Sequence, residues 1–237
     1  MTDVSKSPRR IAGMFDAIAD RYDLLNHVLS AGIDRRWRKR AIRSLSLAGT
    51  ERVLDLCSGT ADLAIEAIRA RPAAADVLGV DFAGAMLRVA REKIARHGLA
   101  NRISLIQGDA TRIPLVDRSV DAIAMAFGIR NVEDPAVACH DMYRVLKPGG
   151  RAAILEFAIP AAPGVRAVYL WYFNHVLPRI GRLVSRHTAA YAYLPASVGA
   201  FSSPQEFVTI LRHSGFVEVS AVPLTFGIAY LYVARKG

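Results

Sequence analysis

The chain has 237 residues, 52% of them hydrophobic, which is enough to bury the core of one α/β domain. It has no run of about 18 uncharged apolar residues, and its short, basic N-terminus lacks the apolar segment of a secretory signal. These features argue against a membrane-spanning or secreted protein. The net charge of +10 predicts an anionic partner, either nucleic acid or a membrane surface, unless the arginines only reflect a GC-rich genome.

The cysteines favour a reducing compartment. The chain has two, Cys57 and Cys139, and both lie within apolar patterns typical of buried free thiols. We therefore expect a cytoplasmic protein without a metal site.

The first fifty residues predict helices. Apolar residues at helical spacing predict an amphipathic helix from Arg10 to about Tyr22. A second helix is predicted to begin at Asp34 as N-cap, with an apolar stripe that starts at Trp37. Six basic residues from Arg35 to Arg43 flank this stripe, as in a helix lying on a membrane surface. A solvated helix that packs its stripe on the core fits the same pattern equally well.

The stretch from Arg52 to Asp62 is the feature around which the rest of the chain is organised. It predicts a strand ending at Leu56, a tight turn through Ser58, Gly59 and Thr60, and then a helix. The free N–H groups at the start of such a helix face the turn and can receive the polar end of a ligand.

A second strand is predicted to end at Asp81, which is well placed to accept hydrogen bonds from ribose hydroxyls. A nicotinamide dinucleotide would require three glycines at the preceding turn, and this turn has only Gly59. S-adenosylmethionine (SAM) has no pyrophosphate, so the pattern favours SAM over NAD.

Strand and helix patterns alternate from Arg52 to Phe157, with further strands over 103–107, 120–126 and 151–157 and helices over 62–71, 84–97 and 134–146. This alternation predicts a doubly wound parallel sheet with a ligand site at the carboxyl ends of its strands. The residues at those ends are Gly59, Asp81, Asp109, Phe127 and Glu156.

From residue 159 to about 200 the alternation stops. The aromatic run from Tyr169 to Phe173 is too short to span a bilayer, and we interpret 159–200 as a helical cover that shapes an apolar substrate pocket. Ser203, Pro204 and Glu206 predict a capped helix that ends at Gly215, followed by two strands. One domain is expected, divided into N-terminal helices (1–50), a cofactor-binding core (51–158), the cover (159–200) and a C-terminal helix with strands (201–237).

Five motifs of the chain belong together. The two longest are Tyr22-Asp23-x-x-Asn26-x-x-Leu29-Ser30-x-x-x-Asp34-x-x-Trp37 and Arg144-Val-Leu-Lys-Pro-Gly-Gly-x-x-x-Ile154-Leu-Glu156. The most specific is Phe127-Gly-Ile-Arg-Asn131, and His175-Val-Leu-Pro178-x-Ile-Gly181 and Tyr191-x-Tyr193-Leu-Pro-x-Ser197 complete the set. These motifs resemble those of the ubiquinone/menaquinone biosynthesis C-methyltransferase family, of the demethylmenaquinone methyltransferase type, and the resemblance extends from about Met14 to Tyr232.

This resemblance implies the class I SAM-dependent methyltransferase fold, a Rossmann-like seven-stranded α/β sheet with an antiparallel last strand. Asp81 would take the ribose hydroxyls, Asp109 the adenine amino group, and Phe82 would lie against the adenine ring. The expected cofactor-binding residues are Asp55, Ser58, Gly59, Thr60, Asp81, Phe82, Asp109, Ala110 and Phe127.

The implied reaction is methylation of a ring carbon of a polyprenylated hydroquinone, which needs help to lose a hydroxyl proton. Arg130 remains protonated, so we assign it electrostatic stabilisation of the phenolate, with a structural ion pair to Glu133 or Asp134 as the alternative. Asn131 would orient the hydroxyl. His175 and Tyr193 are reserve proton acceptors or positioning groups, unless they only pack the cover.

The expected partners are the quinol and the inner face of a membrane, together with a second copy of the chain or other proteins of a quinone pathway. Nucleic acid is not expected, because the chain lacks an RNA-binding module and an Asn/Asp-Pro-Pro-aromatic motif. The alternatives are methylation of another small phenol or lipid, RNA methylation, and a non-catalytic SAM-binding protein.

Overall fold

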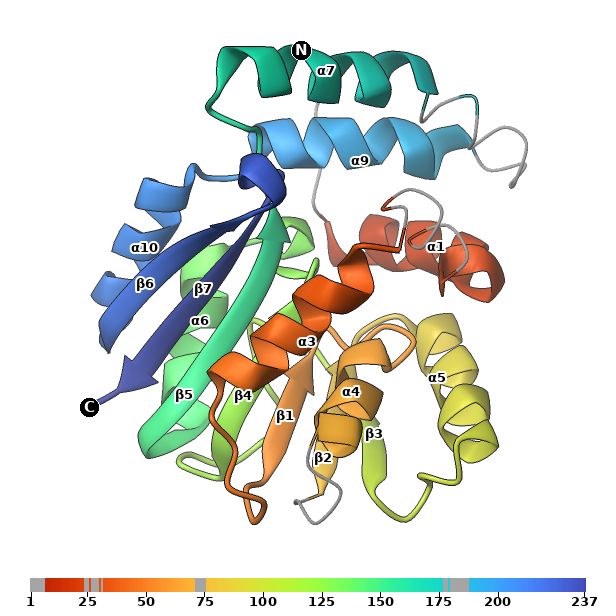
Figure 1. Ribbon diagram of the computed structural model, residues 1–237. Coiled ribbons are helices and arrows are strands. Elements are labelled where there is room, and N and C mark those ends of the chain that lie inside the picture. The colour runs from red at the N-terminus through yellow and green to blue at the C-terminus, as the bar shows by residue number, and fades with distance from the viewer. Residues whose placement is uncertain are drawn as a thin grey trace.

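A seven-stranded sheet in the order β3-β2-β1-β4-β5-β7-β6 forms the centre of the computed structural model (Figure 1). The structure describes residues 7–23, 26, 30, 32–70, 76–176, 179 and 188–237. The strands are β1 (Val53–Leu56), β2 (Val77–Asp81), β3 (Ile103–Gln107), β4 (Val120–Ala126), β5 (Leu146–Phe157), β6 (Phe216–Leu224) and β7 (Ala229–Lys236).

Strands β1 to β5 are parallel, and β7 is antiparallel between β5 and β6. Every residue of β1 and β2 is buried, as expected for central parallel strands that are covered on both faces. The order reverses at β1, from which β2 and β3 extend to one side and β4 and β5 to the other. Open α/β sheets bind ligands in the crevice at such a reversal. The strand order confirms the prediction of a doubly wound seven-stranded fold.

Helices cover both faces of the sheet. Helices α3 (Asp34–Ser44), α4 (Asp62–Ala70) and α5 (Gly84–Arg96) contribute to one apolar core, and α6 (Pro135–Val145) and α10 (Pro204–His213) contribute to the other. The predicted capping box of α10 is present, with Glu206 N–H donating to Ser203 Oγ and Ser203 N–H donating to the Glu206 carboxylate.

Three further helices lie beyond the carboxyl ends of the parallel strands. They are α1 (Pro8–Ile18), α7 (Pro163–Trp171) and α9 (Thr188–Ala200), and Figure 1 shows α7 and α9 above that edge of the sheet. A π-helical turn, Tyr172–Val176, extends α7. The cover predicted after the fifth strand is therefore helical from Pro163 onward over its described residues. Leu29, Pro178 and Gly181 of the sequence motifs lie outside the described residues.

Several predictions for the N-terminal segment need correction. The first helix ends at Ile18 and continues as a 3₁₀ turn, Ala19–Arg21. Asp34 is the first residue of α3 rather than its N-cap, because its carboxylate pairs with Arg38 one turn along and accepts from Ser30 Oγ. The apolar stripe of α3 that begins at Trp37 is buried in the core, so the interpretation of α3 as an interfacial helix is wrong.

Two strand boundaries also differ from the prediction. β5 begins at Leu146, five residues before the predicted start at Arg151, because Leu146 pairs with Val120 across a register shift. The last strand begins at Ala229 rather than Phe226, since residues Thr225–Gly227 form a 3₁₀ turn, η4. Among the helices of the described ranges, none has both the length and the apolar character that crossing a membrane requires.

Candidate active site

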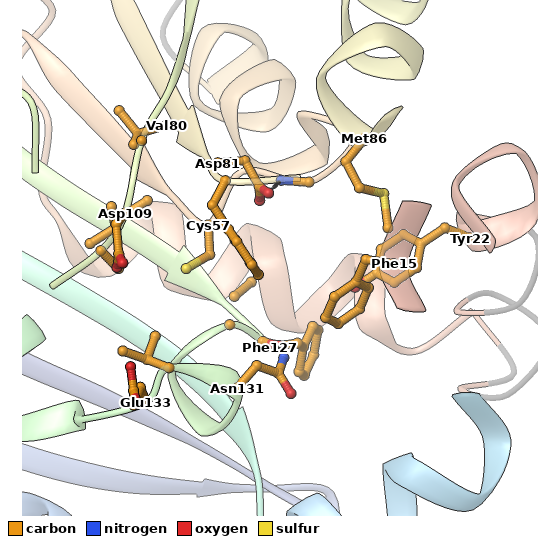
Figure 2. A pocket seen from close by; sticks show the side chains of 18 residues that line it. Phe15, Tyr22, Cys57, Val80, Asp81, Met86, Asp109, Phe127, Asn131 and Glu133 are labelled. Carbon is orange, nitrogen blue, oxygen red and sulfur yellow. Dashed lines mark hydrogen bonds between the residues drawn. The ribbon is translucent and has the colours of Figure 1, made fainter. Parts of the chain in front are cut away.

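A pocket lies where β1, β2 and β4 end, and we call it the strand-end pocket. It brings together six of the nine predicted cofactor-binding residues, and Figure 2 shows the side chains around it. Its lining residues are Phe15, Tyr22, Leu56, Cys57, Gly59, Val80, Asp81, Phe82, Met86, Gly108, Asp109, Ala110, Ala126, Phe127, Gly128, Asn131, Val132 and Glu133.

Asp81 joins the ends of β1 and β2. It is the last residue of β2, and its carboxylate accepts one hydrogen bond from Gly59 N–H (2.8 Å) and one from Ala83 N–H (2.9 Å). Burial raises the pKa of Asp81. Because a carboxylate has about four acceptor sites, the two backbone bonds leave capacity for the hydroxyl groups of a ligand.

The turn after β1 has an unusual backbone. Cys57 and Ala61 have positive φ angles of 55° and 65°, and Gly59 between them has φ 53°. Non-glycine residues rarely adopt this region, and such outliers concentrate at functional sites. The neighbouring turn after β4 approaches closely, since a Cβ on Gly128 would lie 2.5 Å from the Cβ of Cys57. Only glycine fits at residue 128 without movement of the turn.

The other three predicted cofactor-binding residues, Asp55, Ser58 and Thr60, line a small hollow behind the turn, which shares Tyr22, Cys57, Gly59 and Ala126 with the strand-end pocket. Asp55 accepts a hydrogen bond from Ala64 N–H (2.9 Å), and burial raises its pKa to about 8. The buried Ser58 Oγ has no partner among the described residues.

An anchor that the sequence did not indicate holds the N-terminal segment beside this turn. Asp23 accepts hydrogen bonds from Thr60 Oγ1 (2.5 Å) and from Lys93 Nζ (2.6 Å), and Lys93 also pairs with Asp62. Asp23 lies in the resembling N-terminal motif, but its partners are distant in sequence. The hydroxyl of Thr60, predicted as a cofactor contact, is engaged in this anchor.

A second, larger cavity lies under the cover, and we call it the apolar cavity. It has a volume of about 590 Å³ and is lined mainly by aromatic and aliphatic side chains of α1, α7 and α9, of η4 and of the strand ends. The aromatic run predicted to shape a substrate pocket contributes Tyr169, Tyr172 and Phe173. Among the predicted catalytic residues, Arg130 and Tyr193 line this cavity.

Arg130 is buried and paired, but with a partner that differs from those predicted. Its Nη1 donates to Glu156 Oε1 (2.8 Å) and to the carbonyl oxygen of Phe127, and its Nε donates to Ser197 Oγ (3.4 Å). Glu156 is fully buried at the end of β5, whereas Asp134 caps α6. The alternative interpretation of Arg130 as part of an ion pair is therefore correct in kind, but its predicted partners, Glu133 and Asp134, are wrong. No described residue accepts from Nη2 of Arg130, which leaves its two N–H donors for a ligand.

Asn131 faces the strand-end pocket instead of the apolar cavity. Its Nδ2 donates to the carbonyl oxygen of Phe127 (3.2 Å), and its buried Oδ1 has no partner among the described residues. The structure thus places Arg130 and Asn131 on the two sides of Phe127. This position suits Asn131 for a polar group of the cofactor better than for the quinol hydroxyl.

Two tyrosine hydroxyls are left without partners among the described residues, those of Tyr169 and Tyr193. Burial raises the pKa of both, so both are neutral donors near pH 7. Tyr169 was named only as part of an aromatic run. His175 is exposed and stacks on Trp171, with Nδ1 3.1 Å from the Trp171 carbonyl oxygen, and it does not line the cavity. The structure therefore does not bring His175 to Arg130.

The two cavities share part of their walls. Phe15, Tyr22 and Phe127 line both. The Phe127 ring stacks on that of Phe157, with centroids 4.3 Å apart. The two cavities therefore adjoin at these three residues.

A sequence model of the ubiE/COQ5 methyltransferase family matches residues 1–236 of the chain. The chain belongs to the ubiE/COQ5 methyltransferase family. It is 43% identical over 237 residues to the ubiquinone/menaquinone biosynthesis C-methyltransferase UbiE of Geobacter sulfurreducens, covering 100% of this chain and 92% of that one. It is 44% identical to the demethylmenaquinone methyltransferase of Deinococcus radiodurans, with 99% and 95% covered.

The fold of this ubiE/COQ5 family member is also found in a solved structure. The SAM-dependent methyltransferase of Aquifex aeolicus superposes with a TM-score of 0.62 at 18% identity, covering 98% of this chain and 99% of that one. The protein is a SAM-dependent methyltransferase. The strand-end pocket suits SAM, because it offers carboxylates from Asp81 and Asp109, the aromatic ring of Phe82 and Oδ1 of Asn131, to which no residue of the described ranges donates.

Proposed function

We propose that this protein transfers the methyl group of SAM to a ring carbon of a polyprenylated quinol, in the biosynthesis of menaquinone, ubiquinone or both. The observation that carries the proposal is the apolar cavity of about 590 Å³, which adjoins the strand-end pocket and contains one buried arginine. The names of the relatives from Geobacter sulfurreducens and Deinococcus radiodurans support the same reaction.

When bound, SAM supplies a methyl group on a cationic sulfur that departs with the bonding electrons as a ring carbon attacks. Since this leaving group is good, the chain must act mainly on the quinol. A quinol carbon becomes strongly nucleophilic once a neighbouring hydroxyl has lost its proton, and oriented hydrogen-bond donors in the cavity would stabilise the charged ring.

Within this proposal, Arg130 stabilises the phenolate. Its Nη1 is held by Glu156 and the Phe127 carbonyl, so the guanidinium is fixed before substrate arrives, and its Nη2 donors remain for the quinol oxygen. The charge of Glu156 offsets that of Arg130, so the stabilisation comes mainly from oriented N–H groups. Arginine stays protonated and cannot accept a proton, so water would carry away the hydroxyl proton. After the methyl group has bonded to the ring carbon, that carbon would lose its own proton to water as the ring regains aromaticity, and the hydroxyl would be reprotonated, so that one proton is released overall.

The neutral hydroxyls of Tyr169 and Tyr193 would donate to the quinol oxygens and fix the ring in the cavity. Phe157, over which the Arg130 guanidinium lies at 5.5 Å from the ring centroid, would pack against the substrate. Such positioning can contribute as much to the rate as acid–base chemistry does.

We also propose that the protein works in the cytoplasm at the inner face of a membrane, where a prenylated quinol resides. The net charge of +10 and the apolar lining of the cavity support this location. A second copy of the chain and other proteins of a quinone pathway are further candidate partners.

The experiment that tests the proposal measures methyl transfer from labelled SAM to reduced demethylmenaquinone and, separately, to a demethylated benzoquinol, both in detergent. Product from at least one is expected, and the preferred substrate identifies the pathway. If SAM binds but neither quinol is methylated, the acceptor is another phenol or lipid and the proposal fails. A catalytically inactive chain that binds SAM would point instead to the non-catalytic alternative.

A further inference from the structure

An exposed apolar patch lies beside the apolar cavity, and we call it the rim patch. It consists of Val168 (68% exposed) and Trp171 (58%) on α7 and Phe226 (79%) in the turn η4. Val168 and Trp171 are three residues apart and therefore share one face of α7. Both of the large aromatic rings that are strongly exposed among the described residues belong to this patch.

The rim patch is continuous with the inside of the cavity. Val168 and Phe226 themselves line it, and Tyr169, the next residue of α7, is buried within it. Val168 and Phe226 therefore carry apolar surface from the cavity lining to the outside of the protein. A patch of this kind beside a binding cavity marks an interaction site more often than a chance exposure.

The backbone of η4 supports the same reading. Thr225, Phe226 and Gly227 all have positive φ angles, of 43°, 59° and 86°. For a bulky residue this conformation costs on the order of 1 to 2 kcal/mol. The Phe226 ring on this turn is mostly exposed, so in water it gains little from packing to offset that cost. Contact with an apolar phase would make the exposed position favourable.

The charge of the cover is suited to an anionic surface. Between Glu156 and Glu206 the chain has four arginines and no aspartate or glutamate. Arg166, on α7 between the cavity-lining positions, and Arg179 are both exposed. Aromatic side chains with neighbouring arginines are the combination by which interfacial segments bind anionic bilayers.

The volume of the apolar cavity limits how much of a prenylated substrate fits inside it, and the remainder must pass the rim patch. A volume of about 590 Å³ holds a molecule of drug size. The next step rests on the proposed function. If the substrate is a polyprenylated quinol, its ring and the first part of its tail fill the cavity, and the rest of the tail leaves past the rim patch.

We propose that the rim patch docks on an anionic lipid bilayer, with Trp171 and Phe226 inserted at the headgroup level, so that the tail stays in lipid while the ring enters the cavity. The basic helix α3 does not serve this role, because its apolar stripe is buried in the core. The docking face is the cover.

The test is co-sedimentation of the full chain with vesicles of phosphatidylcholine, with and without phosphatidylglycerol. The unaltered protein should bind the anionic vesicles, and Trp171→Ser/Phe226→Ser should weaken this binding at least tenfold. Val116→Ser/Val137→Ser, which alters exposed apolar residues away from the cavity, is the matched control and should bind like the unaltered protein. Equal binding by both variants would overturn the proposal.

A second variant separates docking from catalysis. Trp171→Ser/Arg166→Ser changes residues that do not line the cavity. This variant should methylate a short-tailed quinol in solution at the rate of the unaltered protein. Its rate of methyl transfer to a long-tailed quinol in vesicles should fall at least tenfold. An equal loss of activity on both substrates would contradict docking. A dimer of the unaltered protein that dissociates in the Phe226→Ser variant would also contradict it, because a second copy of the chain would then cover the rim patch. If the unaltered protein binds vesicles but methylates no quinol, the proposed function fails and the docking surface remains.

Discussion

The two cavities are built in different ways. The strand-end pocket is formed by the ends of parallel strands, and its polar groups are held by backbone hydrogen bonds such as those from Gly59 and Ala83 to Asp81. The apolar cavity is the larger of the two, with a volume of about 590 Å³, and is covered by helices. Sheet ends thus hold the groups for the polar contacts of one ligand, while helices create space for an apolar one.

The largest effect is expected from changes to Arg130 and Glu156, the charged pair beside the apolar cavity (the apolar side, as opposed to the polar side at the strand ends). Arg130→Met alone should lower the free energy of unfolding by about 3 to 5 kcal/mol, because it leaves Glu156 buried and unpaired. The double variant Arg130→Met/Glu156→Met should recover most of this stability but no methyl transfer. Urea unfolding and labelled-SAM assays measure the two effects, and recovered activity in the double variant would refute the role of Arg130 in catalysis.

On the polar side, Asp55 should make stability depend on pH. Its folded-state pKa of about 8 lies above the unfolded value near 4, so the native state retains a proton that the unfolded chain releases. The contribution of Asp55 is therefore full below about pH 4 and is lost as pH rises toward 8, by about 2 to 3 kcal/mol between pH 5 and 7. Asp55→Asn should flatten this slope in urea unfolding of the SAM-free protein, and an unchanged slope would contradict the assignment.

Asp81 tests whether the two sides are separate in binding. Removing a charged acceptor of the cofactor costs about 1.5 to 3 kcal/mol, so Asp81→Asn should weaken SAM binding about 10- to 100-fold. Titration calorimetry measures this change. Binding of a quinol analogue without SAM should change less than twofold, and unaltered SAM affinity would remove Asp81 from the site.

The smallest effect is expected for Tyr169→Phe, which deletes one unpartnered hydroxyl of the apolar cavity. We expect KM for the quinol to rise about fivefold, equivalent to about 1 kcal/mol, with SAM affinity unchanged. Stability should stay the same or increase slightly, since a buried polar atom without a partner is removed. Tyr193→Phe deletes the other tyrosine hydroxyl of the cavity and is the variant to compare with Tyr169→Phe. A change in SAM affinity in either variant would contradict the separation of the two sides.

The sequence predicted most of the polar side because its signals are local. A strand from Val53, the small residues of the turn and an acid at the end of the next strand specify the pocket once the sheet is parallel. The contacts that the sequence did not indicate join distant segments, on both sides. Nothing local indicates that Arg130 pairs with Glu156, 26 residues away, or that Thr60 donates to Asp23, 37 residues away. Tyr169 is one aromatic among several, and only its packing identifies its hydroxyl as available.

Helix α3 shows how one pattern can support two functions at the sequence level. Its six basic residues and its apolar stripe fit a membrane surface and a protein core equally well. The stripe packs on the sheet, with Trp37 donating from Nε1 to Thr225 Oγ1 (2.9 Å). An amphipathic pattern in the sequence does not show whether lipid or the rest of the protein covers the apolar face of the helix.

Phe15, Tyr22 and Phe127 line both cavities, so we expect them to couple the binding of the two ligands. The ligand that binds first would restrict these three rings, and the second ligand would then meet a wall whose conformational entropy has already been lost. Linkage requires the effect to be reciprocal, so a SAM analogue should tighten quinol binding by the same factor by which the quinol tightens binding of the analogue. The shared wall thus predicts a cooperative ternary complex.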